Sequence, residues 1–103
     1  MTWNVRREQE VVTCTFTGHL DEFDGRLSAA EFARVVDETD STSVIFDVRG
    51  MKGYDKLARI AWQDVLKPRK AKIKSIDLIG GNTIVRMGAS VMSLATGIPI
   101  TVV

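Results

Sequence analysis

The stretch VIFDVRGMKGYD, from Val44 to Asp55, decides the fold that this sequence predicts. Its first part, Val44–Val48, is a compact apolar run, and apolar runs of this length bounded by turn residues are typical of a buried strand. Arg49 and Gly50 close the run, and Asp55 then stands where the cap of a following helix is expected. A buried strand followed at once by a helix is the unit from which α/β sheets are built.

Helix and strand patterns continue to alternate after Asp55. The next helix has its apolar residues at helical spacing and is stopped by Pro68. A third helix, capped by Asn82 or Thr83, ends at Gly97. The predicted ranges are 57–65 for the second helix, 73–79 for a strand, 84–95 for the third helix and 98–103 for a final strand.

The residues before Val44 predict a hairpin and one more helix. Residues 3–8 and 11–17 have the alternation and β-branched content of two strands, and Gly18 ends the second. Ser28 and Glu31 have the spacing of a capping box, so we expect the first helix to begin there. The element order is therefore ββαβαβαβ, which favours one α/β domain over residues 1–103. We expect a mixed sheet of four or five strands with three or four helices. The sequence does not settle which face each helix covers.

Composition narrows the class of protein. With 103 residues and 45% hydrophobic residues, the chain has room for one core and is not disordered throughout. A single Cys forms no internal disulfide and no N-terminal segment has the apolar core of a signal peptide, so we expect a cytoplasmic location. The 17 uncharged residues 87–103 are interrupted by Gly, Pro and hydroxyl residues, which favours a buried helix and strand over a bilayer span.

The small net charge of +1 hides an asymmetry along the chain. Residues 1–50 carry 5 basic and 10 acidic groups, whereas residues 51–103 carry 9 basic and 3 acidic groups. Either the two halves interleave into one mixed surface, or the asymmetry steers a partner or a second copy. The run KPRKAKIK, residues 67–74, lacks the interleaved aromatics of a nucleic-acid site. We interpret it as a solvated connector and expect neither nucleic-acid nor membrane-surface binding.

With these elements in place, the chain resembles the STAS domain family, which includes anti-sigma-factor antagonists and the bacterial SpoIIAA-like group. Asp47, Gly50 and Asp55 match the family's central strand and loop. The turn with Gly18, Leu20 and Asp21 matches the entry to its first helix, and residues 83–100 match its last helix and strand. The resemblance implies a non-catalytic interaction module in signalling that binds a protein partner or a second copy.

The chain departs from that family at its phosphorylation site. In anti-sigma antagonists the Asp is followed by Ser, Ser or Thr, and Gly, and the second hydroxyl residue takes a phosphate. Here Asp55 is followed by Lys56, Leu57 and Ala58. Because leucine has no hydroxyl group, the phosphoryl switch cannot operate at this position. The resemblance therefore implies a divergent member without the phosphorylatable serine.

We predict an interaction surface from the loop after the central strand and from the third helix. The third helix is apolar on nearly every side, and Arg86 is its one charged residue. It is either an interface helix or a central helix covered by the rest of the fold. The predicted interaction residues are Asp55, Lys56, Leu57, Met87, Val91 and Met92.

Other sites have weaker signals. Gly80, Gly81, Asn82 and Thr83 open the third helix and form either a plain turn or a small-ligand site for a nucleotide or lipid, the alternative function. They lack the P-loop and dinucleotide motifs. An apolar pocket beneath the third helix is the other place where such a ligand could bind. The acidic residues Asp21, Glu22 and Asp24 form either a solvated loop or a weak site for a hard cation. With one His and one Cys, and no nucleophile motif, we predict no enzyme activity and no cofactor.

Overall fold

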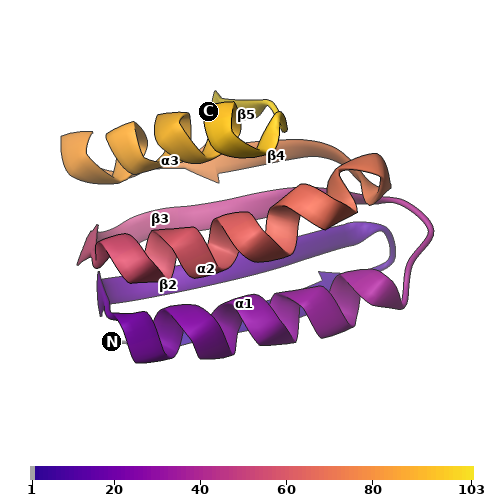
Figure 1. Ribbon diagram of the computed structural model, residues 1–103, viewed down its shortest axis with the longest axis horizontal. Coiled ribbons are helices and arrows are strands. Elements are labelled where there is room, and N and C mark those ends of the chain that lie inside the picture. The colour runs from indigo at the N-terminus through magenta and orange to yellow at the C-terminus, as the bar shows by residue number, and fades with distance from the viewer. Residues whose placement is uncertain (1) are drawn as a thin grey trace.

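The computed structural model describes residues 2–103 as a five-stranded sheet covered by three α-helices (Figure 1). The strand order is β1-β2-β3-β4-β5; β1 is antiparallel to β2, and the remaining pairs are parallel. This confirms the predicted mixed sheet and the order ββαβαβαβ. The elements are β1 Thr2–Glu8, β2 Val11–Leu20, α1 Glu22–Asp37, β3 Thr42–Tyr54, α2 Lys56–Leu66, the 3-10 helix η1 Lys67–Lys72, β4 Ile73–Ile79, α3 Thr83–Thr96 and β5 Ile100–Val102.

All three helices cover the same face of the sheet (Figure 1). Each helix connects two neighbouring parallel strands, and such crossovers are almost always right-handed, so successive helices fall on one side. α1 lies over the β1–β2 end of the sheet and α3 over the β4–β5 end, with α2 between them. The helices therefore all begin at the edge where the parallel strands end.

An aromatic cluster forms the centre of the core between sheet and helices. The Trp62 ring of α2 lies 5.7 Å from the ring of Phe16, 5.4 Å from Phe46 and 5.0 Å from Phe32, measured between centroids. The Trp62 side chain is buried, and its Nε1–H donates a hydrogen bond of 3.0 Å to the Ser28 Oγ. The cluster thus packs α1 and α2 against β2 and β3.

The first helix begins earlier than the capping box predicted. Asp21 is its N-cap, and its carboxylate accepts a hydrogen bond of 2.8 Å from the Asp24 N–H. Ser28 is buried in the middle of α1, where its hydroxyl donates to the Gly25 carbonyl and accepts from Trp62. The capping-box prediction is therefore wrong. Helices α1 and α2 approach each other closely at Gly25. A Cβ on this residue would lie 2.5 Å from the Ala58 Cβ, so the close approach requires glycine.

Four other boundaries also differ from the prediction. Strand β2 continues past Gly18, and β3 continues past Gly50 to Tyr54, because the two strands keep pairing up to their ends. Pro68 ends the α-helix but not the helical backbone, since residues 67–72 form a 3-10 helix. The final strand is limited to Ile100–Val102. The greater length of β2 and β3 arises from tertiary pairing, which overrides local turn signals.

Candidate functional site

The junction between β3 and α2 is built around the Asp55 carboxylate. Asp55 occupies the N-cap position of α2, but its side chain caps no N–H of that helix. Instead the carboxylate accepts hydrogen bonds from the His19 Nε2, at 2.7 Å, and from the Glu22 N–H at the start of α1, at 3.2 Å. Asp55 therefore connects β2, α1 and α2, which is a different role from the cap that the sequence suggested.

This hydrogen bonding has an electrostatic consequence. The hydrogen bond from His19 lowers the pKa of the Asp55 carboxyl group, partial desolvation opposes this, and the Glu22 N–H lowers the pKa further. A carboxylate that accepts two hydrogen bonds is held in its charged form. The charge of Asp55 is thus bound by groups of β2 and α1.

The predicted ligand residues at the start of α3 form a compact turn. Gly80 and Gly81 have φ angles of 77° and 95°, in the region that favours glycine. The Asn82 side chain accepts from the Val85 N–H and donates to the Lys52 carbonyl, both at 2.9 Å. One backbone N–H group at the start of α3, that of Val85, is thus already hydrogen-bonded to the protein's own Asn82 side chain. Ligand binding at Gly80–Thr83 stays a prediction.

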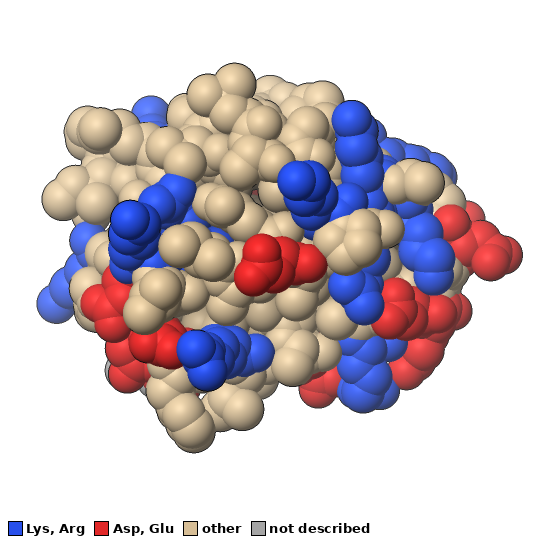
Figure 2. Space-filling model, viewed as in Figure 1, with Lys and Arg blue, Asp and Glu red and all other residues tan. Residues whose placement is uncertain are grey.

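The third helix exposes an apolar stripe, which we define as Ile84, Met87, Val91 and Leu94. These side chains are 59%, 63%, 43% and 87% exposed, and their spacing of three, four and three residues places them on one side of the helix. Figure 2 shows a broad uncharged surface over α3, with basic side chains at its borders. The opposite side, with Val85, Gly88 and Ala89, is buried. The helix is therefore both a core element and a candidate interface.

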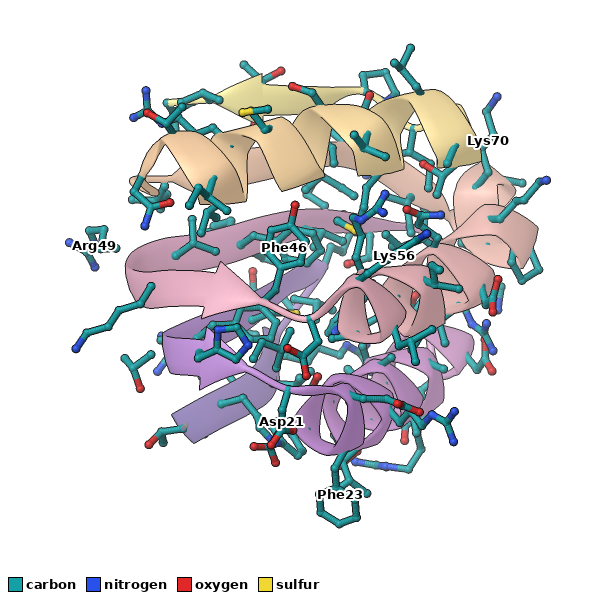
Figure 3. The ribbon with its side chains drawn as sticks, turned by 60° about the vertical axis from the view of Figure 1, so that its left-hand side comes forward. Asp21, Phe23, Phe46, Arg49, Lys56 and Lys70 are labelled. Carbon is teal, nitrogen blue, oxygen red and sulfur yellow. The ribbon has the colours of Figure 1, made fainter. Side chains whose placement is uncertain are left out.

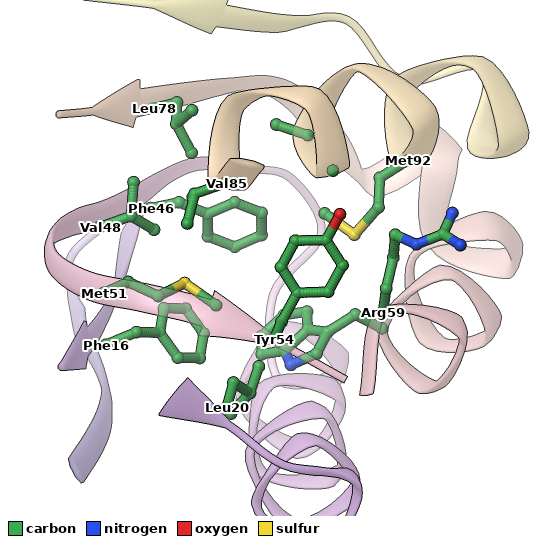
Figure 4. A pocket seen from close by; sticks show the side chains of 13 residues that line it. Phe16, Leu20, Phe46, Val48, Met51, Tyr54, Arg59, Leu78, Val85 and Met92 are labelled. Atoms are coloured by element: carbon green, nitrogen blue, oxygen red, sulfur yellow. The ribbon is translucent and has the colours of Figure 1, made fainter. Parts of the chain in front are cut away.

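A half-open apolar hollow of about 60 Å³ lies between α2 and α3. Met92 lines it, so this predicted interaction residue faces inward, whereas Met87 and Val91 face solvent. The Tyr54 ring stands across the hollow and reaches α3 at Gly88, where a Cβ would lie 2.5 Å from the tyrosine hydroxyl (Figure 4). The hollow is lined by Phe16, Leu20, Phe46, Val48, Met51, Tyr54, Arg59, Trp62, Leu78, Val85, Gly88, Ala89 and Met92.

The side of α2 that faces this hollow is basic. Arg59 lines the hollow, and Lys56 shares its side of the helix because the two are three residues apart. The Arg59 guanidinium donates to the Gln63 Oε1 at 3.1 Å. Within residues 2–103, neither Lys56 nor Arg59 belongs to an ion pair with a carboxylate. We call the stripe, the hollow and these two cations together the α2–α3 face.

The other charged segments of the sequence are mostly occupied by internal contacts. In the basic run, Arg69 makes two hydrogen bonds to the Asp37 carboxylate, at 3.0 and 2.9 Å, and Lys74 lies 3.3 Å from Glu10. In the acidic segment, Asp21 caps α1 and Glu22 pairs with Arg26. No group of three His, Cys, Asp or Glu residues placed to hold a metal ion occurs in the described part of the chain.

The fold places the protein in a known structural class. The structure matches that of the anti-sigma factor antagonist SpoIIAA in its unphosphorylated form, with a TM-score of 0.70 and 11% sequence identity. The match covers 99% of this chain and 87% of the SpoIIAA chain. The structure also matches an uncharacterised protein of the DUF3478 family with a SpoIIAA-like fold from Shewanella loihica, with a TM-score of 0.71, 12% identity and 84% coverage of that chain. The chain therefore has a SpoIIAA-like fold, as the STAS resemblance predicted.

Sequence comparisons add no closer relationship. No family model matches the chain, and no curated protein matches it in sequence. Among the helices described in residues 2–103, none is both long enough and apolar enough to span a bilayer. The structural likeness thus establishes the fold, and the site must be judged on its own geometry.

Some features of this site were not found from the sequence. The exposed stripe was detectable, because residues 84, 87, 91 and 94 repeat at heptad-like spacing. An apolar pocket beneath the third helix was expected, but its basic wall at Arg59 and the bond between His19 and Asp55 were missed. These features join residues from separate elements, and only the packing of α2 beside α3 and of β2 beside β3 brings them together.

Proposed function

We propose that this protein is a non-catalytic interaction module whose binding surface is the α2–α3 face. The exposed stripe on α3 is the observation that carries the proposal. Four neighbouring aliphatic side chains that are at least 43% exposed form a contiguous apolar surface, and such surfaces on soluble domains are typical of interaction sites. Lys56 and Arg59 border this surface and add a preference for an acidic partner.

The loop after β3 carries no phosphoryl switch, and Leu57 faces the groove between α1 and α2 beside Arg26, not the α2–α3 face. Leu57 is 50% exposed in the first turn of α2, where a serine or threonine would be needed to accept a phosphate. Asp55 is held by His19 and Glu22 and supplies a fixed negative charge. We therefore propose that binding is regulated by partner concentration and not by phosphorylation at this position.

The chemistry of the single cysteine, Cys14, supports a non-catalytic role. The Cys14 thiol is fully buried in the core, and burial raises its pKa, so it stays protonated and out of reach of substrates. The His19 imidazole pairs with Asp55, an exposed structural contact between elements. A free buried thiol also supports our proposal of a cytoplasmic location.

Site-specific crosslinking tests the proposed surface directly. A photoreactive amino acid at position 87 is expected to capture a defined protein, or a second copy, in cells that produce the variant. The same group at Val103, an exposed apolar residue outside the α2–α3 face, is the matched control. If position 87 captures nothing above this control, the α2–α3 face is not an interaction surface and the proposal is wrong.

A small apolar ligand is a second candidate, favoured by the hollow between α2 and α3. Its lining is almost entirely apolar, with Arg59 as the one charged side chain. This favours a lipid-like molecule over a nucleotide, which needs several polar contacts. Thermal-shift measurements with fatty acids and with nucleotides separate the two, and an unchanged melting temperature in both series would exclude this function.

A further inference from the structure

We propose that the α2–α3 face binds helix α1 of a second copy, so that copies of this protein associate head to tail. This inference rests on the proposed function, because it names the occupant of the same face. The occupant must offer exposed apolar side chains for the stripe and carboxylates for Lys56 and Arg59. Both requirements are met by the outer side of α1.

Helix α1 presents its own apolar pair to solvent. Phe23 is 69% exposed and Leu27 is 45% exposed, and their spacing of four residues places them next to each other on the helix. Figure 3 shows Phe23 projecting from the start of α1, away from the body of the protein. A large exposed aromatic side chain is a typical anchor at protein interfaces, where it fills a hollow of the partner.

Acidic side chains flank this pair. Asp24 and Glu31 lie seven residues apart, two turns along the same side of α1, beside the line from Phe23 to Leu27, and Glu31 also pairs with Arg34 of the same helix. Within residues 2–103, Asp24 forms no ion pair with a basic side chain. Helix α1 carries four acidic side chains against two basic ones, Arg26 and Arg34. It therefore combines an apolar ridge with a net acidic border, which complements the apolar stripe and basic border of the α2–α3 face.

Charge also argues against the simplest alternative, a symmetric dimer in which α3 packs on α3. In that arrangement the basic borders of both copies, with Lys56 and Arg59, would approach each other without carboxylates between them. Like charges brought together at an interface oppose association. Pairing α1 with the α2–α3 face instead places an acidic border against a basic one, which is also the pairing of the acidic first half with the basic second half.

The two surfaces lie at opposite ends of the helix layer, which covers one face of the sheet. α1 covers the β1–β2 end of the sheet and α3 the β4–β5 end (Figure 1), so one copy cannot join its own two surfaces. Contacts between different surfaces are heterologous, and they continue into a ring or an open filament. The α1 helix of each copy would then bind the α2–α3 face of one neighbour, and its own α2–α3 face would bind α1 of the other neighbour.

Two blocking variants test the proposal by light scattering after size exclusion and by sedimentation velocity. Phe23→Glu disables the α1 surface and Met87→Glu disables the α2–α3 face. Because both side chains are more than 60% exposed, the fold should be retained, and circular dichroism with thermal melting verifies this. The wild type is expected to grow in mass with concentration, and high salt should weaken this association by about tenfold through screening.

Mixing the variants gives the decisive result. Each variant alone is expected to be monomeric, whereas the equimolar mixture should form a 1:1 heterodimer and nothing larger, because one intact surface remains on each chain. Val103→Glu, the matched control, should associate like the wild type. If the wild type remains monomeric at about 1 mM, or if Phe23→Glu still associates while Met87→Glu does not, the head-to-tail proposal is wrong. Crosslinking at position 87 to a different protein would then still support the proposed function.

Discussion

The hydrogen bond between Ser28 and Trp62 predicts a measurable energetic coupling between α1 and α2. The Ser28 hydroxyl is fully buried and accepts from the Trp62 Nε1–H at 3.0 Å while donating to the Gly25 carbonyl at 3.1 Å. Replacement by alanine would leave the indole N–H buried without a partner. Leaving a buried donor unsatisfied costs about 1–3 kcal/mol, so we expect Ser28→Ala to lower the free energy of unfolding by about 2 kcal/mol. For a domain of this size, that corresponds to a decrease in melting temperature of about 10 °C.

The assay is a double-mutant cycle measured by urea unfolding, with far-UV circular dichroism as the signal. The four proteins are the wild type, Ser28→Ala, Trp62→Phe and the double variant. Once phenylalanine replaces Trp62, no indole N–H remains without a partner. The loss of the Ser28 hydroxyl should then lower the free energy of unfolding by a smaller amount. We expect a coupling energy of about 1–2 kcal/mol between the two positions.

The cycle distinguishes this role from the capping role that the sequence suggested for Ser28. A cap residue would also destabilise the protein when replaced by alanine, by about 1 kcal/mol, but with no dependence on Trp62. Additive effects, within about 0.5 kcal/mol, would therefore refute the bridging role.

Three further predictions concern the backbone and the charges. Gln9 has a φ angle of 56°, which is strained for a residue with a side chain, so Gln9→Gly should stabilise the protein by about 0.5–1 kcal/mol in urea unfolding. Gly25→Ala should destabilise it by about 1–3 kcal/mol, because the new Cβ would lie 2.5 Å from that of Ala58. Since the His19 hydrogen bond lowers the pKa of Asp55, the wild type should be more stable than Asp55→Asn above the ordinary Asp value of 3.8. The difference should disappear as the pH falls below it, in unfolding measured across pH.

Matched variants serve as controls for these predictions. Gly88→Ala makes the same change in another helix, but there the new Cβ meets only side-chain atoms of Tyr54, at 2.5 Å, whereas at Gly25 it also meets the Ala58 backbone. Gly88→Ala should therefore destabilise the protein less than Gly25→Ala. If the two variants lost the same free energy of unfolding, close packing of α1 on Ala58 would not be the reason that position 25 requires glycine. His19→Ala should reduce the pH dependence attributed to Asp55, and an unchanged dependence would show that the imidazole is not its main cause. For Gln9, a destabilising glycine would mean that the turn is unstrained.

The order of elements could be predicted from the sequence because its cause is local. Alternation of apolar residues, the stop at Pro68 and the left-handed Gly97 at the end of α3 mark helices and strands without reference to the rest of the chain. The five-stranded α/β architecture and its likeness to SpoIIAA follow from that order, since right-handed crossovers leave few arrangements. The exposed stripe on α3 was also within reach, because helical spacing alone groups its residues.

Tertiary packing decided the features that depend on contacts between distant segments. The sequence made Ser28 a helix cap, yet the structure buries it against Trp62, because Gly25 lets α1 approach α2 closely. The sequence made Asp55 the cap of its own helix, yet its carboxylate binds His19 and the start of α1. A residue type limits the kinds of partner that a side chain can bind. Which partner lies near enough is decided by the packing of the helices on one face of the sheet. The α2–α3 face and its acidic counterpart on α1 arise for the same reason: the fold has placed them at opposite ends of the helix layer that covers one face of the sheet.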